Sequence, residues 1–395
     1  FNEGGKVSLK KIVQAAVRLI MTAQIFVVPC GTRLTAVSAQ RSRHPGHKKK
    51  QHRLVGRLAV PAVILILVLS TVFIFFYRKE YKPLIVDHNP SVYTYEDLVS
   101  DTDLLKSRYS SVFSADSLGE TADGRQILHF IIGNEDASRK ILVNGGIHAR
   151  EYITCQLVMK QTVSFLKHIK SGDSYEDISY KDLLQDTAIH VICMVNPDGV
   201  SISQQGLDGV QTDTVRKNLE QISQMDGASL SDNDYLEQWK SNANGVDLNR
   251  NFDALWDSYA DPAGHPSADH YKGTAPGCEA ESNALIQLTL QEHFSRTISY
   301  HTQGDVIYWY FGQEGSLYDQ TLSFANTIAA ATGYSLDADY QALDPAGYKD
   351  WAILSQGIPS LTIEVGTGDT PVSPDQFETI WKENQFVWEE MLKTL

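Results

Sequence analysis

Apolar runs of strand length recur from residue 93 onward and alternate with longer segments of helical periodicity. Six runs predict strands: Ile127–Ile132, Ile141–Gly145, Ala188–Val195, Thr297–Tyr300, Val306–Tyr310 and Ser360–Val365. Four segments predict helices: Ile153–Ile169, Glu279–His293, Ser316–Thr332 and Gln376–Leu392. This alternation is typical of an α/β domain with a mixed or largely parallel central sheet flanked by helices. Residues 201–275 give little strand signal, and such a long irregular stretch is usually functional or disordered.

One run is much longer than a strand. Leu58 to Tyr77 contains no charged residue and, as a helix, would span about 30 Å, the thickness of a bilayer core. We predict a transmembrane helix over residues 55–77; a buried core helix is the alternative, but few of these residues could face water. The basic run His47–Arg53 precedes it, so the positive-inside rule predicts a cytoplasmic N-terminus. The expected localisation is the cell membrane, single-pass, with the larger part outside.

Charge divides the chain in the same way. The first 82 residues hold 15 of the 34 Lys and Arg but only Glu3 and Glu80 of the 48 acidic residues. We therefore predict a basic cytoplasmic segment 1–54, the membrane helix 55–77, a linker 78–92 and an acidic domain 93–395. Nucleic acid is not an expected partner, because phosphate binding needs a basic face.

Metal-binding residue types end two of the predicted strands. His148 and Glu151, three positions apart, follow the run Ile141–Gly145, and His301 closes the run Thr297–Tyr300. Two histidines and one glutamate, with one position left for water, make a hydrolytic zinc site. A lone His-x-x-Glu is a weak signal, since a single histidine is more often structural than ligating. The interpretation therefore depends on the motifs that accompany it.

Further motifs follow in a fixed order along the chain: Asn144–Tyr152, Asn196–Gly199, Arg216–Lys217, Gly245–Phe252, Ser299–His301, Tyr340–Ala342, Lys349–Trp351 and Leu361–Gly366. This series resembles the zinc metallocarboxypeptidase family, the carboxypeptidase A-like peptidases, over about residues 91–395. The resemblance implies that family's mixed sheet flanked by helices. It also implies one Zn²⁺ per chain, held by His148, Glu151 and His301, and a peptide substrate with a free C-terminal carboxylate.

The resemblance also implies catalytic roles. Glu364 matches the family's catalytic glutamate, which takes the proton of the attacking water. Arg216 matches the cation that stabilises the oxyanion, although Val215 stands where the family often has an aromatic residue and the spacing from Asn196–Gly199 is about five residues longer. A surface arginine therefore stays open as the alternative. Asp247 matches the carboxylate that orients the first zinc histidine.

Substrate-binding residues follow from the same resemblance. Asn249 and Arg250 match the pair that binds the terminal carboxylate, with Arg150 as an assistant. Tyr340 matches the mobile tyrosine that closes over substrate. Since the stretch from Tyr340 to Asp350 is two residues longer than in carboxypeptidase A, Tyr348 is a rival.

Lys349 departs from the animal enzymes at the position of the specificity-pocket residue. A lysine there favours a negative side chain on the substrate; the alternative is a lysine that points to solvent. The chain resembles bacterial relatives that split γ-D-glutamyl–diaminopimelate bonds of cell-wall peptides, which carry stretches similar to GGIHARE and GYKDW. We therefore expect a membrane-anchored carboxypeptidase acting outside the cell, with cell-wall peptide hydrolysis as an alternative. A non-catalytic binding module and a hydrolase of non-peptide amides are the remaining hypotheses.

Overall fold

The computed structural model describes residues 65–72, 82–338 and 345–395. The chain divides into two compact units, residues 1–75 and 76–395, and each is described by itself. Residues 65–72 of the first unit are helical, and Leu65, Leu67 and Leu69 are each more than half exposed. Among the described residues, none of the helices combines the length and the apolar character that crossing a bilayer requires. The rest of the predicted membrane segment, residues 55–64 and 73–77, lies outside the described residues.

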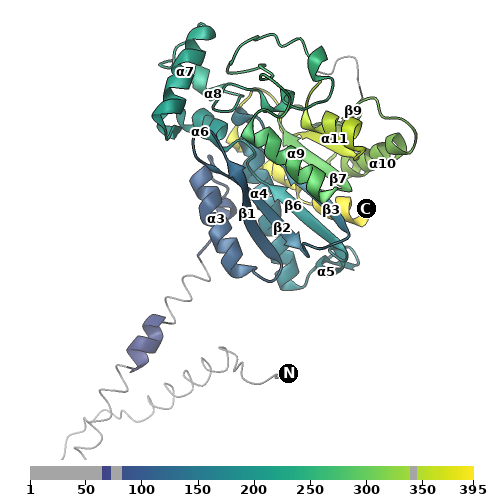
Figure 1. Ribbon diagram of the computed structural model, residues 1–395. Helices are drawn as coiled ribbons and strands as arrows, with labels where there is room; N and C mark the ends of the chain where they lie inside the picture. The colour runs from purple at the N-terminus through teal and green to yellow at the C-terminus, as the bar shows by residue number, and fades with distance from the viewer. Residues whose placement is uncertain (1–64, 73–81, 339–344) are drawn as a thin grey trace, which may run out of the picture. The chain divides into compact units, whose positions relative to one another are not determined.

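The second unit is built on an eight-stranded sheet with the order β1-β2-β6-β3-β7-β10-β8-β9 (Figure 1). The four central strands β6, β3, β7 and β10 are mutually parallel, and an antiparallel neighbour borders them on each side, β2 beside β6 and β8 beside β10. At the edges, β1 is antiparallel to β2 and β9 is parallel to β8. The predicted mixed sheet is thus confirmed. The strands are β1 (Phe113–Glu120), β2 (Gln126–Gly133), β3 (Arg139–Asn144), β6 (Thr187–Ile192), β7 (Arg296–His301), β8 (Val306–Tyr308), β9 (Ser335–Asp337) and β10 (Ser360–Glu364). A separate hairpin pairs β4 (Ser174–Tyr175) with β5 (Ile178–Ser179).

Helices cover both faces of the sheet because its central strands are apolar on both faces. On β3, Ile141 and Val143 belong to one hydrophobic cluster and Leu142 to another, as the alternation of side chains along a strand requires. The first cluster takes residues from α3, α4, α10, α12 and α13, and the second takes residues from α9 and α11. The helices are α3 (Tyr95–Arg108), α4 (Ile153–Ser171), α5 (Tyr180–Leu183), α6 (Pro197–Gln205), α7 (Asp213–Met225), α8 (Asn233–Glu237), α9 (Ala280–Glu292), α10 (Gly315–Thr332), α11 (Tyr348–Gln356), α12 (Phe377–Asn384) and α13 (Val387–Lys393).

A third cluster forms a lobe from α6, α7 and α8, which gather at one end of the unit (Figure 1). Its apolar side chains include Val215 and Leu219 of α7, Trp239 after α8, and Ala149 from the loop that follows β3. The described chain has no strand between β6 and β7, in agreement with the weak strand signal of residues 201–275. That region is nevertheless ordered.

Two predicted boundaries differ from the structure. Part of the predicted linker 78–92 packs onto the domain: Leu84 and Val86 are fully buried, and Asp101 of α3 accepts hydrogen bonds from the backbone N–H groups of Ile85 and Val86. The predicted helix Gln376–Leu392 is two helices, α12 and α13, separated at residues 385–386.

Candidate metal centre and active site

The candidate metal ligands meet at one edge of the sheet. β3 and β7 are adjacent and parallel, so the residues that follow their carboxyl ends lie on the same side. His301 is the last residue of β7, and His148 comes four residues after the end of β3. His148 also begins the 3₁₀ turn Ala149–Glu151, which brings the Glu151 carboxylate back toward its ring.

A glycine makes the tight turn into this loop possible. Gly146 has φ +64°, and a Cβ atom there would lie 2.4 Å from Cys155 Sγ. Its N–H donates to Thr154 Oγ1, whose hydroxyl in turn donates to the carbonyl of Glu151. The start of α4 thereby fixes the metal-binding loop.

The three ligands converge on one point. Glu151 Oε1 is 2.8 Å from His148 Nδ1, Glu151 Oε2 is 2.9 Å from His301 Nδ1, and the two Nδ1 atoms are 3.1 Å apart. All three side chains are buried. Ligands 2.0–2.1 Å from a tetrahedral zinc ion lie about 3.3 Å from one another. The donor set and its spacing therefore fit a zinc ion.

Electrostatics favour a charged carboxylate here. Burial alone would raise the pKa of the Glu151 carboxyl, but the rings of His148 and His301 outweigh burial and hold its pKa well below the usual value. Burial would lower the pKa of His301, and the Glu151 carboxylate raises it instead. The site is thus built to hold positive charge.

Asp247 lies on the far side of the first histidine. Its Oδ1 is 3.2 Å from His148 Nε2 and accepts a hydrogen bond from the N–H of Asn249. Burial alone would raise the pKa of the Asp247 carboxyl. The positive charges of Lys240 and His148 outweigh burial, so its pKa lies well below the usual value. The carboxylate therefore faces the ring nitrogen opposite the one that faces the other ligands.

Glu364 ends β10 and is the register partner of His301 in the parallel β7–β10 ladder. Paired residues point to the same face of a sheet, so the Glu364 side chain lies on the side of the metal ligands. Burial raises its pKa to about 8, with His301 opposing and Glu151 adding to the shift; Lys240 and Arg250 also oppose it. A partly desolvated carboxyl beside the ligands fits the position expected of a base.

Arg216 is in the first turn of α7, and the structure does not connect it to this group through any contact that it describes. Its guanidinium donates to the carbonyls of Leu207 (3.1 Å) and Val210 (3.5 Å). The cations that act on Glu364 are Lys240 and Arg250. The role of Arg216 stays a prediction.

Asn249 and Arg250 lie on the 3₁₀ turn Leu248–Arg250, directly after Asp247. Asn249 Oδ1 accepts a hydrogen bond from the N–H of Tyr348, which joins this turn to the start of α11. The Arg250 guanidinium donates to the Asn249 carbonyl at 2.8 Å and lies 5.3 Å from the centre of the Tyr259 ring. Its positive charge reaches both Asp247 and Glu364.

Arg150 points toward the loops that precede and follow Asp247. It donates to the carbonyl of Gln238 at 3.1 Å and lies 3.3 Å from Asp269 Oδ2. These contacts define an ion pair within the protein, and binding of substrate by Arg150 stays a prediction.

Lys349 does not point to solvent, so that alternative was wrong. It is buried, with Nζ 2.5 Å from Asp350 Oδ1, 3.4 Å from the carbonyl of Tyr310 and 5.2 Å from the centre of the Phe311 ring. Asp350 therefore neutralises its charge within the protein, and the preference for a negative substrate side chain stays a prediction. Tyr348 is fully buried and its hydroxyl is 2.9 Å from Thr289 Oγ1, so it is anchored in the core and cannot close over a substrate. Tyr340 lies outside the described residues.

Lys240 is a residue that the sequence analysis missed. It is 7% exposed, and its Nζ is 2.8 Å from Asp247 Oδ2 and 3.1 Å from Asp269 Oδ1. Its position five residues before the motif Gly245–Phe252 is the one available signal in the sequence, and a lysine there gives no hint of burial.

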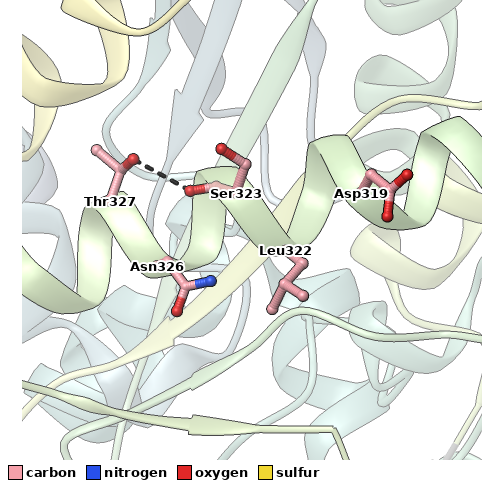
Figure 2. Close-up of a pocket in the computed structure, with 5 residues that line it drawn as sticks. All are labelled: Asp319, Leu322, Ser323, Asn326 and Thr327. Carbon is pink, nitrogen blue, oxygen red and sulfur yellow. Dashed lines mark hydrogen bonds between the residues drawn. The ribbon is translucent and has the colours of Figure 1, made fainter.

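A depression elsewhere on the surface is lined by residues that do not include a histidine or a cation. Figure 2 shows its five labelled residues along one helix, α10, with Asp319 as the one carboxylate among them and Thr327 Oγ1 bonded to the carbonyl of Ser323. In the described part of the chain, His148, Glu151 and His301 are the one group of three His, Cys, Asp or Glu side chains close enough together to hold a metal ion.

Comparisons with known proteins agree with this geometry. A model of the zinc carboxypeptidase family matches residues 98–387. Gamma-D-glutamyl-L-diamino acid endopeptidase 1 of Lysinibacillus sphaericus is 30% identical over 292 residues, covering 74% of this chain and 70% of the relative. Carboxypeptidase B of Helicoverpa zea is 28% identical over 236 residues, covering 58% and 48%. The solved structure of carboxypeptidase A from Helicoverpa armigera has the same fold, with a TM-score of 0.58 at 19% identity over 77% of this chain and 72% of that one. This chain therefore belongs to the zinc carboxypeptidase family and is a zinc-dependent hydrolase.

Proposed function

We propose that the chain is an exopeptidase that hydrolyses the last peptide bond of a substrate with a free terminal carboxylate. The observation that supports this most directly is the meeting of His148, Glu151 and His301 at one point, with Glu364 in register beside His301. A metal site with a neighbouring carboxyl is the arrangement that hydrolysis of an amide requires.

His148, Glu151 and His301 would hold the zinc ion. Bound zinc supplies a water of lowered pKa and an electrophile for the scissile carbonyl. The Glu364 carboxylate would take a proton from the attacking water and pass it to the nitrogen of the leaving amine. Asp247 keeps a proton on His148 Nε2, so that Nδ1 stays available as a ligand.

The terminal carboxylate of the substrate, on the far side of the scissile bond from the attacked carbonyl, is held by a cation. Arg250 forms two parallel hydrogen bonds to the terminal carboxylate, Asn249 adds an amide donor, and Arg216 donates to the developing oxyanion. The role that the family resemblance implies for Tyr340 concerns a residue outside the described part of the chain. Because a carboxylate is recognised, cleavage is directed to the end of the chain.

The test is hydrolysis of an N-blocked dipeptide with a free or an amidated C-terminus. We expect turnover of the free acid, loss of turnover with a zinc chelator, and recovery when zinc is restored. Equal rates on the amidated peptide would refute exopeptidase action, and turnover that survives removal of metal would refute the zinc mechanism.

A second candidate concerns the terminal residue. The family resemblance puts Lys349 at the position of the specificity-pocket residue, and the name of the Lysinibacillus relative specifies a diamino acid. We propose that the terminal side chain carries a carboxylate, as in glutamate or diaminopimelate, and that a cell-wall peptide is a natural source. The pairing of Lys349 with Asp350 favours a side chain that bears both an ammonium and a carboxylate over a simple acid.

Peptides that end in diaminopimelate, Glu, Phe and Lys, assayed side by side, test this candidate. Lys349→Met should reduce the preference for acidic ends about tenfold, whereas Lys272→Met, which alters a lysine bonded to the carbonyls of Trp256 and Tyr259, should leave it unchanged. Preference for Phe or Lys in the wild type would contradict the candidate.

We also propose that residues 55–77 anchor the protein in the cell membrane, with the catalytic domain outside. Supporting this, residues 65–72 expose apolar side chains around the helix, and the Thr71 hydroxyl bonds to the carbonyls of Leu67 and Val68 rather than needing water. Fractionation of cells that express the whole chain should find it in the membrane, and deletion of residues 55–77 should release it. A wild-type chain found in the soluble fraction would refute the anchor.

A further inference from the structure

Lys240 occupies a buried position between two carboxylates. Its Nζ is 2.8 Å from Asp247 Oδ2 and 3.1 Å from Asp269 Oδ1, and its side chain is 9% exposed. Its backbone is fixed as well, because its N–H donates to the carbonyl of Ala268. A lysine this buried is normally paired, and here both partners are acidic.

The carboxylates of Asp247 and Asp269 both contact the metal-binding loop His148–Glu151. Asp247 Oδ1 is 3.2 Å from His148 Nε2, and Asp269 Oδ2 is 3.3 Å from an Arg150 guanidinium nitrogen. Between these two residues, the N–H of Ala149 donates to the carbonyl of Lys240 at 3.0 Å. Three consecutive residues of the metal-binding loop are therefore held by Lys240, directly or through one carboxylate.

The contacts from His148 through Asp247, Lys240 and Asp269 to Arg150 form a closed ring of residues, and the charges along this ring alternate. Asp247 and Asp269 are negative, Lys240 and Arg150 are positive, and the ring begins and ends on the loop His148–Glu151. Without Lys240, Asp247 and Asp269 would lose their shared cation, and the buried Asp247 carboxylate would lose the ion-pair partner of its Oδ2. His148 would then lose its own support, and metal affinity depends on such support.

We propose that Lys240 is a positioning residue of the metal centre: by joining Asp247 to Asp269, and through its own carbonyl, it holds His148, Ala149 and Arg150 in the geometry that binds zinc. The inference rests on the proposed assignment of His148 and Asp247 to the metal centre. It does not depend on which peptide bond is cut, because zinc binding alone can test it.

The experiment measures zinc affinity of the whole protein by competition with a chromogenic chelator. Lys240→Met should bind zinc about tenfold or more weakly, since loss of outer partners of a metal site costs about 10–100-fold in affinity. Lys240→Arg, which can bridge both carboxylates, should recover affinity to within about threefold of wild type. The matched control is Lys140→Met, which removes a lysine paired with Glu292 at the opposite end of β3 and should leave affinity unchanged.

Combined variants separate positioning from general damage to the fold. In the Asp247→Asn background, Lys240→Met should weaken zinc binding by much less than it does alone, because both changes act through one carboxylate. If Lys240→Met fails to fold, Lys240→Met/Asp269→Asn removes one charge of each sign and should fold but still bind zinc about tenfold more weakly. Wild-type affinity in either variant, or fully additive losses with Asp247→Asn, would overturn the proposal. A wild-type protein that binds no zinc would instead refute the proposed function.

Discussion

Glu364 on β10 stands opposite His301 on β7 in a parallel ladder, so the candidate base and the last candidate ligand are fixed by the same backbone hydrogen bonds. We expect Glu364→Gln to lower kcat by about 100-fold or more, because general acid–base catalysis typically contributes about 10²–10⁴. Zinc content should stay near one per chain. Steady-state kinetics with metal analysis measures both.

The matched control is Glu389→Gln. Glu389 is also buried, burial raises its pKa to about 7, and it accepts a hydrogen bond from Tyr180 on another helix. This variant should keep kcat within about twofold. Normal turnover of Glu364→Gln would remove Glu364 from the mechanism.

Arg250→Ala and Arg216→Ala should fail in different ways. A charged hydrogen bond contributes about 1.5–3 kcal/mol, so Arg250→Ala should reduce kcat/KM about 10–100-fold on peptides with a free terminal carboxylate and little on amidated ones. An oxyanion donor acts on every substrate, so Arg216→Ala should lower kcat equally on both. Comparing the two variants on matched free and amidated peptides distinguishes the roles, and a selective loss for Arg216→Ala would reassign it to carboxylate binding.

A buried histidine pair predicts that stability falls in mild acid. His129 Nε2 and His190 Nδ1 are 3.0 Å apart between β2 and β6. Burial lowers the pKa of His129 to about 4, and burial together with His129 lowers that of His190 to about 3. The unfolded chain, with ordinary values near 6.5, takes up protons first as pH falls. The stability that the pair contributes is thus present above about pH 6.5 and is lost below it, by up to about 1.4 kcal/mol per pH unit for each histidine.

Denaturant unfolding at pH 7 and pH 5 measures this dependence. Replacing both residues, as in His129→Asn/His190→Asn, should flatten the curve between these values relative to wild type. Replacing the more exposed His265 should leave the slope as it is. An unchanged slope in the double variant would show that the pair does not control acid stability.

Gly146 should tolerate no side chain. Gly146→Ala places a Cβ atom 2.4 Å from Cys155 Sγ at a positive φ, and we expect a loss of about 2–5 kcal/mol in unfolding free energy together with weaker zinc binding. Gly172→Ala, also at positive φ but with open space around it, should cost only about 1 kcal/mol. Adding Cys155→Ala should recover part of the loss. Stability of Gly146→Ala equal to that of Gly172→Ala would rule out the steric conflict.

The sequence predicted the central strands well because they are buried on both faces and read as continuous apolar runs, as Ile141–Gly145 does. It missed β1 and α3, whose polar exposed faces interrupt the pattern. It grouped His148, Glu151 and His301 because they lie at or just after the ends of two apolar runs and because the accompanying motifs resemble one family. The structure adds the reason that they meet, since β3 and β7 are parallel neighbours. It could not foresee that Asp350 pairs with Lys349, or that Lys240 is buried, because both depend on contacts between loops far apart in the chain.

The position of β7 between β3 and β10 has one more consequence. His148 and His301 come from segments about 150 residues apart, and a chain in which β7 has not yet inserted beside β3 does not bring these two imidazoles to one ion. Zinc binding by all three ligands therefore requires that the connection from β6 to β7, the longest between neighbouring strands in the chain order of the described sheet, has closed. The rate at which a refolding chain binds zinc therefore reports the rate at which β7 joins β3 at the centre of the sheet.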